Sequence, residues 1–191
     1  MIGRLTALEI DAKPEGDVAL SGGVRLAEQL AQLQLYVVLS PLEKLFERPE
    51  RRVKLAVLQA MQTLFFKRSF TTVRAGLRDP DAAVVEQAAK AVEALYFQHA
   101  VDPLSRILRE SPQPGVRASA LRALSRIDTL EAAEILLAVI EHGAPSDRAA
   151  ALSALKSARG VKFVELARGA MEGAAGPLHA SLREVLASRG L

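Results

Sequence analysis

A helical pattern recurs along this chain with a nearly constant period, and no other feature of the sequence limits the fold as strongly. Its copies are 31, 32, 31 and 31 residues apart and begin at Val53, Val84, Val116, Asp147 and Leu178. A fixed period of this length is typical of stacked structural repeats, in which each unit buries its apolar face only against its neighbours. We therefore expect one small helical unit in each copy.

Each copy has an apolar stripe with the spacing of one helix face. When the first residue of a copy is counted as position 0, the stripe occupies positions 0, 4, 7, 8 and 11. Positions 4 and 7 hold mostly small residues, namely Ala60, Ala88, Ala91, Ala120, Ala123, Ala151 and Ala154. Small side chains at these positions allow helix backbones to approach closely.

A second helix is expected before each copy, and the two are joined by turns rich in Pro, Gly, Asp and Ser. These preceding helices are expected over residues 41–46, 69–77, 100–108, 131–140 and 162–171. Ser40 and Asp102 each precede a proline, so we expect them to cap their helices, with Glu43 completing a capping box at Ser40. The predicted fold class is all-α, with about five helix pairs.

Three motifs in the chain resemble short HEAT repeats. The string Asp79-Pro80-Asp81-Ala82-Ala83-Val84 is the first motif, and the second and third are Val116-Arg117-x-x-Ala120-x-x-Ala123-Leu124 and Arg148-x-x-Ala151-x-x-Ala154-Leu155. They are similar to the variety also called phycobilin-lyase-type HEAT-like repeats, and the resemblance covers residues 40–189. It implies a right-handed α-α superhelix whose concave face is lined by the second helix of each pair. Val85 departs from the pattern because it stands where Arg is usual.

The ends of the chain depart from the repeat. Residues 24–39 are expected to form a helix that caps the N-terminal side, with Val24-Arg25 as a repeat start. Residues 1–20 do not repeat, and we expect an N-terminal arm or a small hairpin there, made from residues 5–10 and 18–20. The domain organisation is thus an arm over residues 1–20 and a solenoid over residues 21–191.

The composition excludes several classes of site. The chain has no cysteine, which rules out thiolate catalysis, disulfides and Cys-ligated zinc and favours a reducing compartment, by default the cytoplasm. Its most apolar stretch, residues 35–39, is too short to span a bilayer, and no apolar run follows a basic start at the N-terminus. We therefore expect neither membrane insertion nor secretion.

Positive charge is concentrated near the N-terminal end of the predicted repeats. Residues 44–78 contain nine basic residues against two acidic ones, a net charge of +7 that leaves −4 for the rest of the chain. The candidate binding residues in this stretch are Arg51, Arg52, Lys67 and Arg68, which could meet an acidic protein surface or phosphates. Solvated helix faces without a partner are the alternative interpretation.

Three cations occupy exposed positions of the second helices. Lys90 and Arg122 share one repeat position and Arg126 lies one turn further, so they could clamp a carboxylate or phosphate of a partner. The equally weighted alternative is that they pair with Glu86 and Glu93. By contrast, the basic residues at position 1, Lys54, Arg117 and Arg148, are expected to bond turn carbonyls or aspartates between repeats.

No arrangement of residues predicts catalysis. His99, His142 and His179 do not share a repeat position, so they are not expected to converge on a metal or a proton. The acid pairs Asp79 with Asp81 and Glu131 with Glu134 stand at helix starts, where caps and dipole partners are the expected roles. We expect no catalytic residue, no metal and no cofactor.

The sequence favours a non-catalytic scaffold or adaptor. The expected partner is a protein that is bound by the concave helical face and the basic N-terminal end. Binding of nucleic acid through residues 44–78 is the alternative, and an enzyme of the HEAT-like glycosylase or lyase kind is a more distant one. The sequence leaves the oligomeric state open.

Overall fold

The computed structural model describes residues 17–158, 160–173 and 177–190, and these residues form helices, turns and loops without a strand. The chain divides into two compact units, residues 1–95 (unit 1) and residues 96–191 (unit 2). None of the described helices has the length and apolar character needed to cross a membrane. The predicted all-α class is confirmed for the part of the chain that is described.

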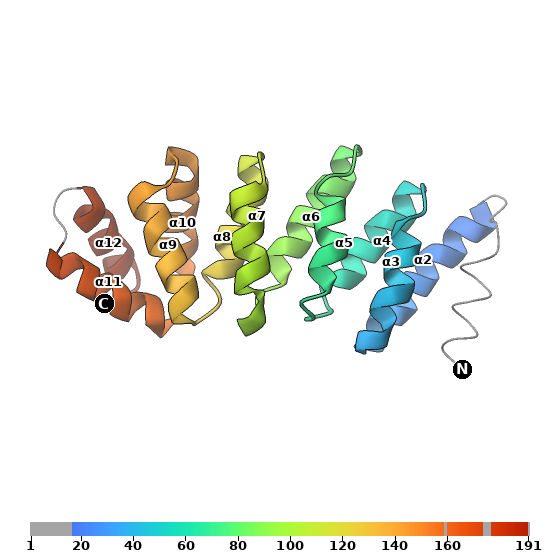
Figure 1. Ribbon diagram of the computed structural model, residues 1–191, viewed down its shortest axis with the longest axis horizontal. Helices are drawn as coiled ribbons and strands as arrows, with labels where there is room; N and C mark the ends of the chain where they lie inside the picture. Colours follow the sequence, from blue (N-terminus) through green and yellow to red (C-terminus); the bar gives the residue numbers. More distant parts are fainter. Residues whose placement is uncertain (1–16, 159, 174–176, 191) are drawn as a thin grey trace. The chain divides into compact units, whose positions relative to one another are not determined.

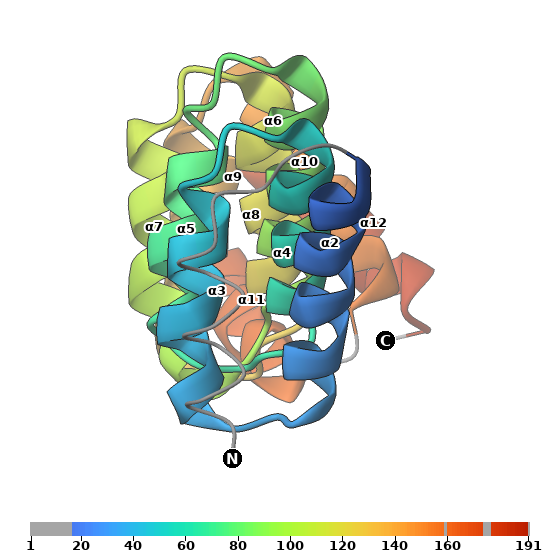
Figure 2. The same ribbon diagram turned by 90° about the vertical axis from the view of Figure 1, so that its right-hand side faces the viewer.

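Unit 1 contains two helix pairs and one additional helix. Its elements are α2 (Asp17–Gln32), the 3-10 helix η1 (Tyr36–Val38), α3 (Leu39–Phe46), α4 (Arg51–Met61), α5 (Ser69–Gly76) and α6 (Ala82–Ala94). The first helices of the pairs, α3 and α5, pack in one layer, and the second helices α4 and α6 pack in another together with α2 (Figures 1 and 2). Helix α2 therefore occupies the position of a second helix, but no first helix precedes it within the described residues.

Unit 2 contains three helix pairs in the same order. Its elements are the 3-10 helix η2 (Gln98–Ala100), α7 (Val101–Glu110), α8 (Pro114–Leu124), α9 (Leu130–His142), α10 (Pro145–Ser157), α11 (Val161–Gly173) and α12 (Pro177–Ser188). The first helices α7, α9 and α11 pack in sequence, and the second helices α8, α10 and α12 do the same. The two units together supply the five predicted pairs.

The predicted apolar stripe is the core of each unit. In the copies that begin at Val53, Val84 and Val116, every side chain at positions 0, 4, 7, 8 and 11 is buried. Each second helix begins two residues or one residue before its predicted start, and the stripe keeps its register. Burial of one helix face against neighbouring helices is the main source of stability for helices of this length.

Gly76 shows how closely the helices approach. It is the last residue of α5 and is buried against α6 and α4. A Cβ atom added at Gly76 would lie 3.0 Å from the Cβ of Ala88 and 3.1 Å from a methyl group of Leu58. A side chain at this site would therefore require Ala88 or Leu58 to shift by a few tenths of an ångström.

The N-terminal predictions need correction. Residues 18–20, expected in an arm or hairpin, lie in the first turn of α2, while residues 1–16 fall outside the described part of the chain. The capping helix ends at Gln32, because Gln34 takes a left-handed conformation with φ of 50°. Its buried face is formed by Gly23, Leu26, Ala27 and Leu30 and begins one residue before the predicted start at Val24.

The predicted caps at Ser40 and Asp102 are wrong. Helix α3 follows Val38 and α7 follows Ala100, and neither of these N-cap residues makes a side-chain capping bond. The 3-10 helices η1 and η2 lead directly into these two α-helices, which places Ser40 and Asp102 inside the first turn. Asp81, in contrast, does cap α6, since its carboxylate accepts a hydrogen bond of 2.8 Å from the backbone N–H of Ala83.

Replacing Gly76 by Val tests the close approach of α5 to α6. We expect Gly76→Val to lower the free energy of unfolding by about 1–3 kcal/mol, because the new methyl groups have no space. Gly169→Val is the matched control, since a Cβ at helical Gly169 meets no atom within 4 Å, and it should change stability by less than about 0.5 kcal/mol. Equal effects in chemical denaturation would contradict the packing described here.

Candidate functional site

Two kinds of connection alternate along the chain. Repeat turns join the first helix of a pair to the second and span residues 47–50 and 77–81 in unit 1 and 111–113 and 143–144 in unit 2. Return loops join a second helix to the next first helix and include residues 33–38 and 62–68 in unit 1 and 125–129 in unit 2. The two kinds differ sharply in chemistry.

Ion pairs tie the repeat turns of unit 1 to the preceding second helix. The Nζ of Lys54 in α4 donates a 2.6 Å hydrogen bond to Oδ2 of Asp79 in the turn before α6. The Arg51 guanidinium of the same helix lies 3.3 Å from the carboxylate of Asp81, the cap of α6. The Lys54–Asp79 pair is the stronger tie, because its side chains are only 20% and 7% exposed.

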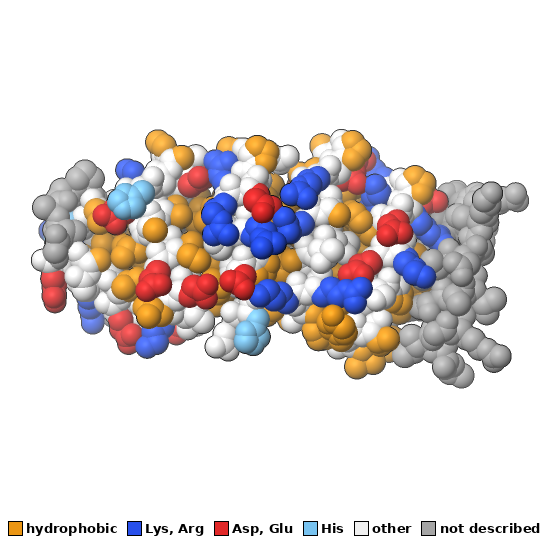
Figure 3. Space-filling model, viewed as in Figure 1, with side chains coloured by type: hydrophobic (Ala, Val, Ile, Leu, Met, Phe, Trp, Pro, Cys, Tyr) orange, Lys and Arg blue, Asp and Glu red, His pale blue; other side chains and the backbone are white. Residues whose placement is uncertain are grey.

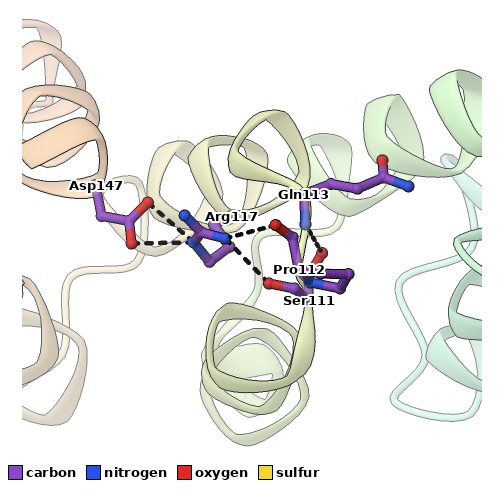
Figure 4. A network of polar contacts seen from close by, with 5 residues as sticks. All are labelled: Ser111, Pro112, Gln113, Arg117 and Asp147. Atoms are coloured by element: carbon purple, nitrogen blue, oxygen red, sulfur yellow. Dashed lines mark hydrogen bonds and ion pairs between the residues drawn. The ribbon is translucent and has the colours of Figure 1, made fainter. Parts of the chain in front are cut away.

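The same arrangement recurs in unit 2 around Arg117 (Figure 4). Its Nε donates to both carboxylate oxygens of Asp147 in α10 at 3.0 Å, and its Nη1 donates to the carbonyls of Ser111 and Pro112. Arg148 occupies the same position in the next repeat and donates to the carbonyls of Glu141 and Gly143. The predicted structural role of the position 1 cations is confirmed.

The environment of Asp79 lowers its pKa. Burial alone would raise the pKa, but hydrogen bonds from the Lys54 ammonium and from the backbone N–H of Asp81, together with the Lys54 charge, lower it below the ordinary 3.8. A lowered folded-state pKa means that the ionised carboxylate stabilises the fold at neutral pH. Asp79 and Asp81, two of the acids considered for acid–base chemistry, thus have structural partners.

The return loops expose apolar side chains instead. Among the described residues, every large hydrophobic side chain that is exposed lies in a return loop, in the connection that leads into α7, or at the helix start directly after a return connection. They are Leu33, Leu35, Tyr36, Val37 and Phe65 in unit 1, and Tyr96, Leu130 and Val161 in unit 2. Scattered exposure is ordinary for a protein surface, but exposure confined to one kind of loop marks a distinct surface.

The five exposed side chains of unit 1 come from two neighbouring return loops, and we call them the Tyr36 cluster (Leu33, Leu35, Tyr36, Val37 and Phe65). The ring of Tyr36 meets the ring of Phe66 edge to face, with centroids 5.5 Å apart. The Arg68 guanidinium lies 5.9 Å from the centroid of the Tyr36 ring. Contacts from residues 66 and 68 to residue 36 therefore hold the two loops together.

Arg68 also fixes the position of the cluster relative to α3. Its guanidinium donates to both carboxylate oxygens of Glu43, at 2.9 and 2.6 Å, and to the hydroxyl of Ser40 at 3.2 Å. The hydrogen bond to Glu43 raises the pKa of Arg68, so the guanidinium remains charged. Ser40 and Glu43, predicted to form a capping box, thus bind a cation of the next repeat.

The return loops of unit 2 are also linked by specific contacts. The Arg126 guanidinium lies 5.0 Å from the centroid of the Tyr96 ring, a cation–π contact. The carboxylate of Asp128 accepts a 2.8 Å hydrogen bond from the backbone N–H of Lys162 at the start of α11. Exposed Leu130 and Val161 begin the two first helices that these contacts join.

Each of the predicted clamp residues has a partner within its own unit. Lys90 forms a 2.8 Å ion pair with Glu86 of its own helix. Arg122 donates to the hydroxyl of Ser119 at 3.0 Å, and Arg126 stacks on Tyr96. Lys90 belongs to unit 1 and the two arginines to unit 2, so a joint clamp stays a prediction.

The basic stretch is split between two edges of unit 1. Arg51 and Arg52 begin α4, whereas Lys67 and Arg68 follow its end in the return loop. The 11 residues of α4 separate the two pairs by about 16 Å at 1.5 Å per residue. These four residues therefore do not form one patch, and a phosphate backbone would meet two separate pairs of cations.

No group of three or more His, Cys, Asp or Glu side chains within the described ranges could hold a metal ion. His99 and His142 are exposed in η2 and at the end of α9, and His179 is half-buried in α12. Glu131 and Glu134 are exposed in the first turns of α9. The three histidines lie on three different elements of unit 2, η2, α9 and α12.

The Tyr36 cluster was missed by sequence reasoning. Residues 33–39 are almost continuously apolar and follow a helix directly, so they were assigned to the buried face of a longer helix. The polar Gln34 inside that run was the one local signal for a break. Gln34 does not show whether the residues before and after it are exposed, because their exposure depends on the position of the return loop in the fold.

Part of the chain is similar to a known family of helical repeats. A family model described as HEAT repeats matches residues 70–156. This segment is similar to HEAT repeats. The predicted resemblance is thereby confirmed over this segment, which includes α6, α7, α8, α9 and most of α10. No curated protein sequence matches the chain.

Several solved structures are similar to this chain at low identity. A designed armadillo repeat protein, YIII(Dq)4CqI, has 14% identity and a TM-score of 0.48 over 98% of this chain and 99% of its own. Another designed armadillo protein, solved in complex with the peptide (KR)4, has 16% identity and a TM-score of 0.43 over 97% and 98%. The complex of CpcE and CpcF of phycocyanin lyase from Nostoc sp. PCC7120 has 17% identity and a TM-score of 0.43 over 98% and 81%.

The ion pair between Lys54 and Asp79 predicts a pH-dependent loss of stability. Asp79→Asn should lower the free energy of unfolding at neutral pH by about 1–3 kcal/mol, since it weakens a charge-assisted hydrogen bond that is almost fully buried. Because the folded-state pKa of Asp79 lies below 3.8, the difference from the wild type should persist above that pH and vanish as the pH falls through the folded-state value.

Denaturant unfolding of both proteins across acid and neutral pH measures this difference. Glu134→Gln, at an exposed site of α9, is the control and should change stability by less than about 0.5 kcal/mol at every pH. A difference between wild type and Asp79→Asn that grows as the pH falls would contradict the assigned sign.

Proposed function

We propose that this chain is a non-catalytic scaffold that binds a partner protein, and that it works in the cytoplasm. The observation that carries the proposal is the confinement of the exposed large hydrophobic side chains to the return connections in both units. Surfaces of this kind are typical of protein–protein contacts, in which a few buried aromatic or aliphatic anchors provide most of the affinity. Repeat proteins also bind through extended surfaces rather than one deep pocket.

The repeat turns and the return loops make different kinds of contact, and this difference supports the same function. At the repeat turns, Lys54, Arg117 and Arg148 are committed to aspartates and backbone carbonyls. The rigid turns hold the helices in register, while the return loops are left to present apolar side chains. The acids at the turns are thus engaged in structural contacts, which favours binding over acid–base chemistry.

The exposed positions of the second helices form an additional part of the proposed surface. Arg122 is half-buried and Arg126 is exposed at the end of α8, close to exposed Tyr96. Guanidinium groups beside an aromatic ring are frequent anchors at protein interfaces. We propose that this part of unit 2 contacts carboxylates of the partner.

Recovery of a partner from a lysate of the source cells tests the proposed function. The purified chain should retain a defined protein after nuclease treatment and at high salt, because apolar anchors do not depend on ionic strength. Recovery of nucleic acid alone, lost at high salt, would instead support the binding of phosphates by the basic residues.

Charge reversal at two arginines tests the contribution of unit 2. The double variant Arg122→Glu and Arg126→Glu should weaken binding of the recovered partner by about tenfold or more. Helicity and melting temperature should stay close to those of the wild type, because Arg122 is only half-buried in α8 and Arg126 is exposed in the return loop that follows it. Lys156→Glu, an exposed cation of α10, is the matched control. Unfolding of the double variant would assign the two arginines to structure instead.

A further inference from the structure

The Tyr36 cluster has the properties of a docking site for a short peptide. Its side chains are highly exposed, with Tyr36 at 55%, Val37 at 59% and Phe65 at 52%. Figure 3 shows hydrophobic side chains gathered beside the lower ends of α3 and α5 in this view, with Lys and Arg side chains next to them. An apolar surface with a charged border is the usual composition of a binding site.

The charge around the cluster is of one sign. Residues 33–42 and 62–71, which contain both return loops and the helix starts after them, hold Lys67 and Arg68 and no Asp or Glu. The nearest acid, Glu43, is bound to the Arg68 guanidinium in a bidentate ion pair. The border of the cluster is therefore positive, and a ligand with negative charge is the complementary one.

The cluster is also held in place before any ligand arrives. The Arg68 contacts with Tyr36, Glu43 and Ser40 and the packing of Tyr36 on Phe66 join the two loops. Side chains that are positioned in advance lose less conformational entropy on binding. Arg68 is thus a positioning residue for the cluster, and Glu43 balances its charge.

The size of the cluster favours a short segment over a globular surface. Five side chains on two loops offer far less than the roughly 800 Å² that each partner buries in a stable complex of two globular proteins. A linear segment needs only two or three apolar anchors that insert between such side chains. This argues against a second copy of the chain as the occupant.

We propose that the Tyr36 cluster binds a short linear segment of a partner protein in which aliphatic or aromatic anchors lie beside Asp or Glu residues. The anchors contact Tyr36, Val37 and Phe65, and the carboxylates lie near Lys67 and Arg68. This inference rests on the proposed function and identifies the chemistry of the partner at unit 1.

Selection from a displayed library of random linear peptides tests the proposal with the full chain as the target. Enriched peptides should combine apolar anchors with acidic residues. The double variant Tyr36→Ser and Phe65→Ser should weaken binding of a synthetic enriched peptide by about tenfold or more. Lys67→Glu should weaken it severalfold and reduce its dependence on salt.

The matched control changes the exposed apolar residues of unit 2. The double variant Leu130→Ser and Val161→Ser removes side chains of similar exposure from the same kind of connection, and it should leave peptide affinity unchanged. Val37→Ser is a second variant of the cluster in case loss of the Tyr36–Phe66 contact disturbs folding. Circular dichroism and thermal melting establish that each variant is folded.

The outcomes separate this inference from the proposed function. Binding that is lost in the unit 2 control but kept in the cluster variants would overturn the inference and leave a protein-binding scaffold. Enrichment of basic peptides, or no enrichment, would also overturn it. Concentration-dependent dimerisation in light scattering, abolished by the cluster variants, would assign the cluster to a second copy and overturn it as well.

Discussion

The close approach of consecutive helices is the constraint on which each unit depends. A single helix pair cannot bury its apolar face alone, so every second helix must pack against the next. Positions 4 and 7 make this approach possible, since Ala88, Ala91, Ala120 and Ala123 have no exposed surface. The same constraint explains why Gly76 is glycine, because a Cβ there would lie 3.0 Å from the Cβ of Ala88. The small and medium side chains of the composition are what this packing requires.

The repeat turns and the return loops that connect the packed helices have different roles. At the repeat turns, cations at position 1 fix the register between neighbouring repeats, as Lys54 does with Asp79 and Arg117 with Asp147. At the return loops, apolar side chains reach the surface. A scaffold needs both properties, because a binding surface made of loops is selective only where the helices behind it are rigid.

Much of this could be predicted from the sequence, for a physical reason. The period and the apolar stripe report local helix geometry, so the residues around Val53, Val84 and Val116 were assigned correctly to the core. Lys54 and Arg117 were predicted to be structural because they recur at one position beside turn aspartates. The Tyr36 cluster was not predicted, since residues 33–39 have the composition of a buried helix and only the left-handed turn at Gln34 separates them from α2. Likewise, residues 51 and 68 belong to one basic stretch of sequence but lie at opposite ends of α4.

Site-specific crosslinking tests the central claim that binding occurs at the return loops. The chain has no cysteine, so a single engineered cysteine can carry a photoactivated crosslinker at one known site. Val37→Cys places it on a return loop, and Ala82→Cys places it beside a repeat turn, where the native side chain is also exposed. The account predicts that, in a lysate of the source cells, a defined protein is crosslinked from residue 37 and not from residue 82. Crosslinking of that protein from residue 82 alone would contradict it.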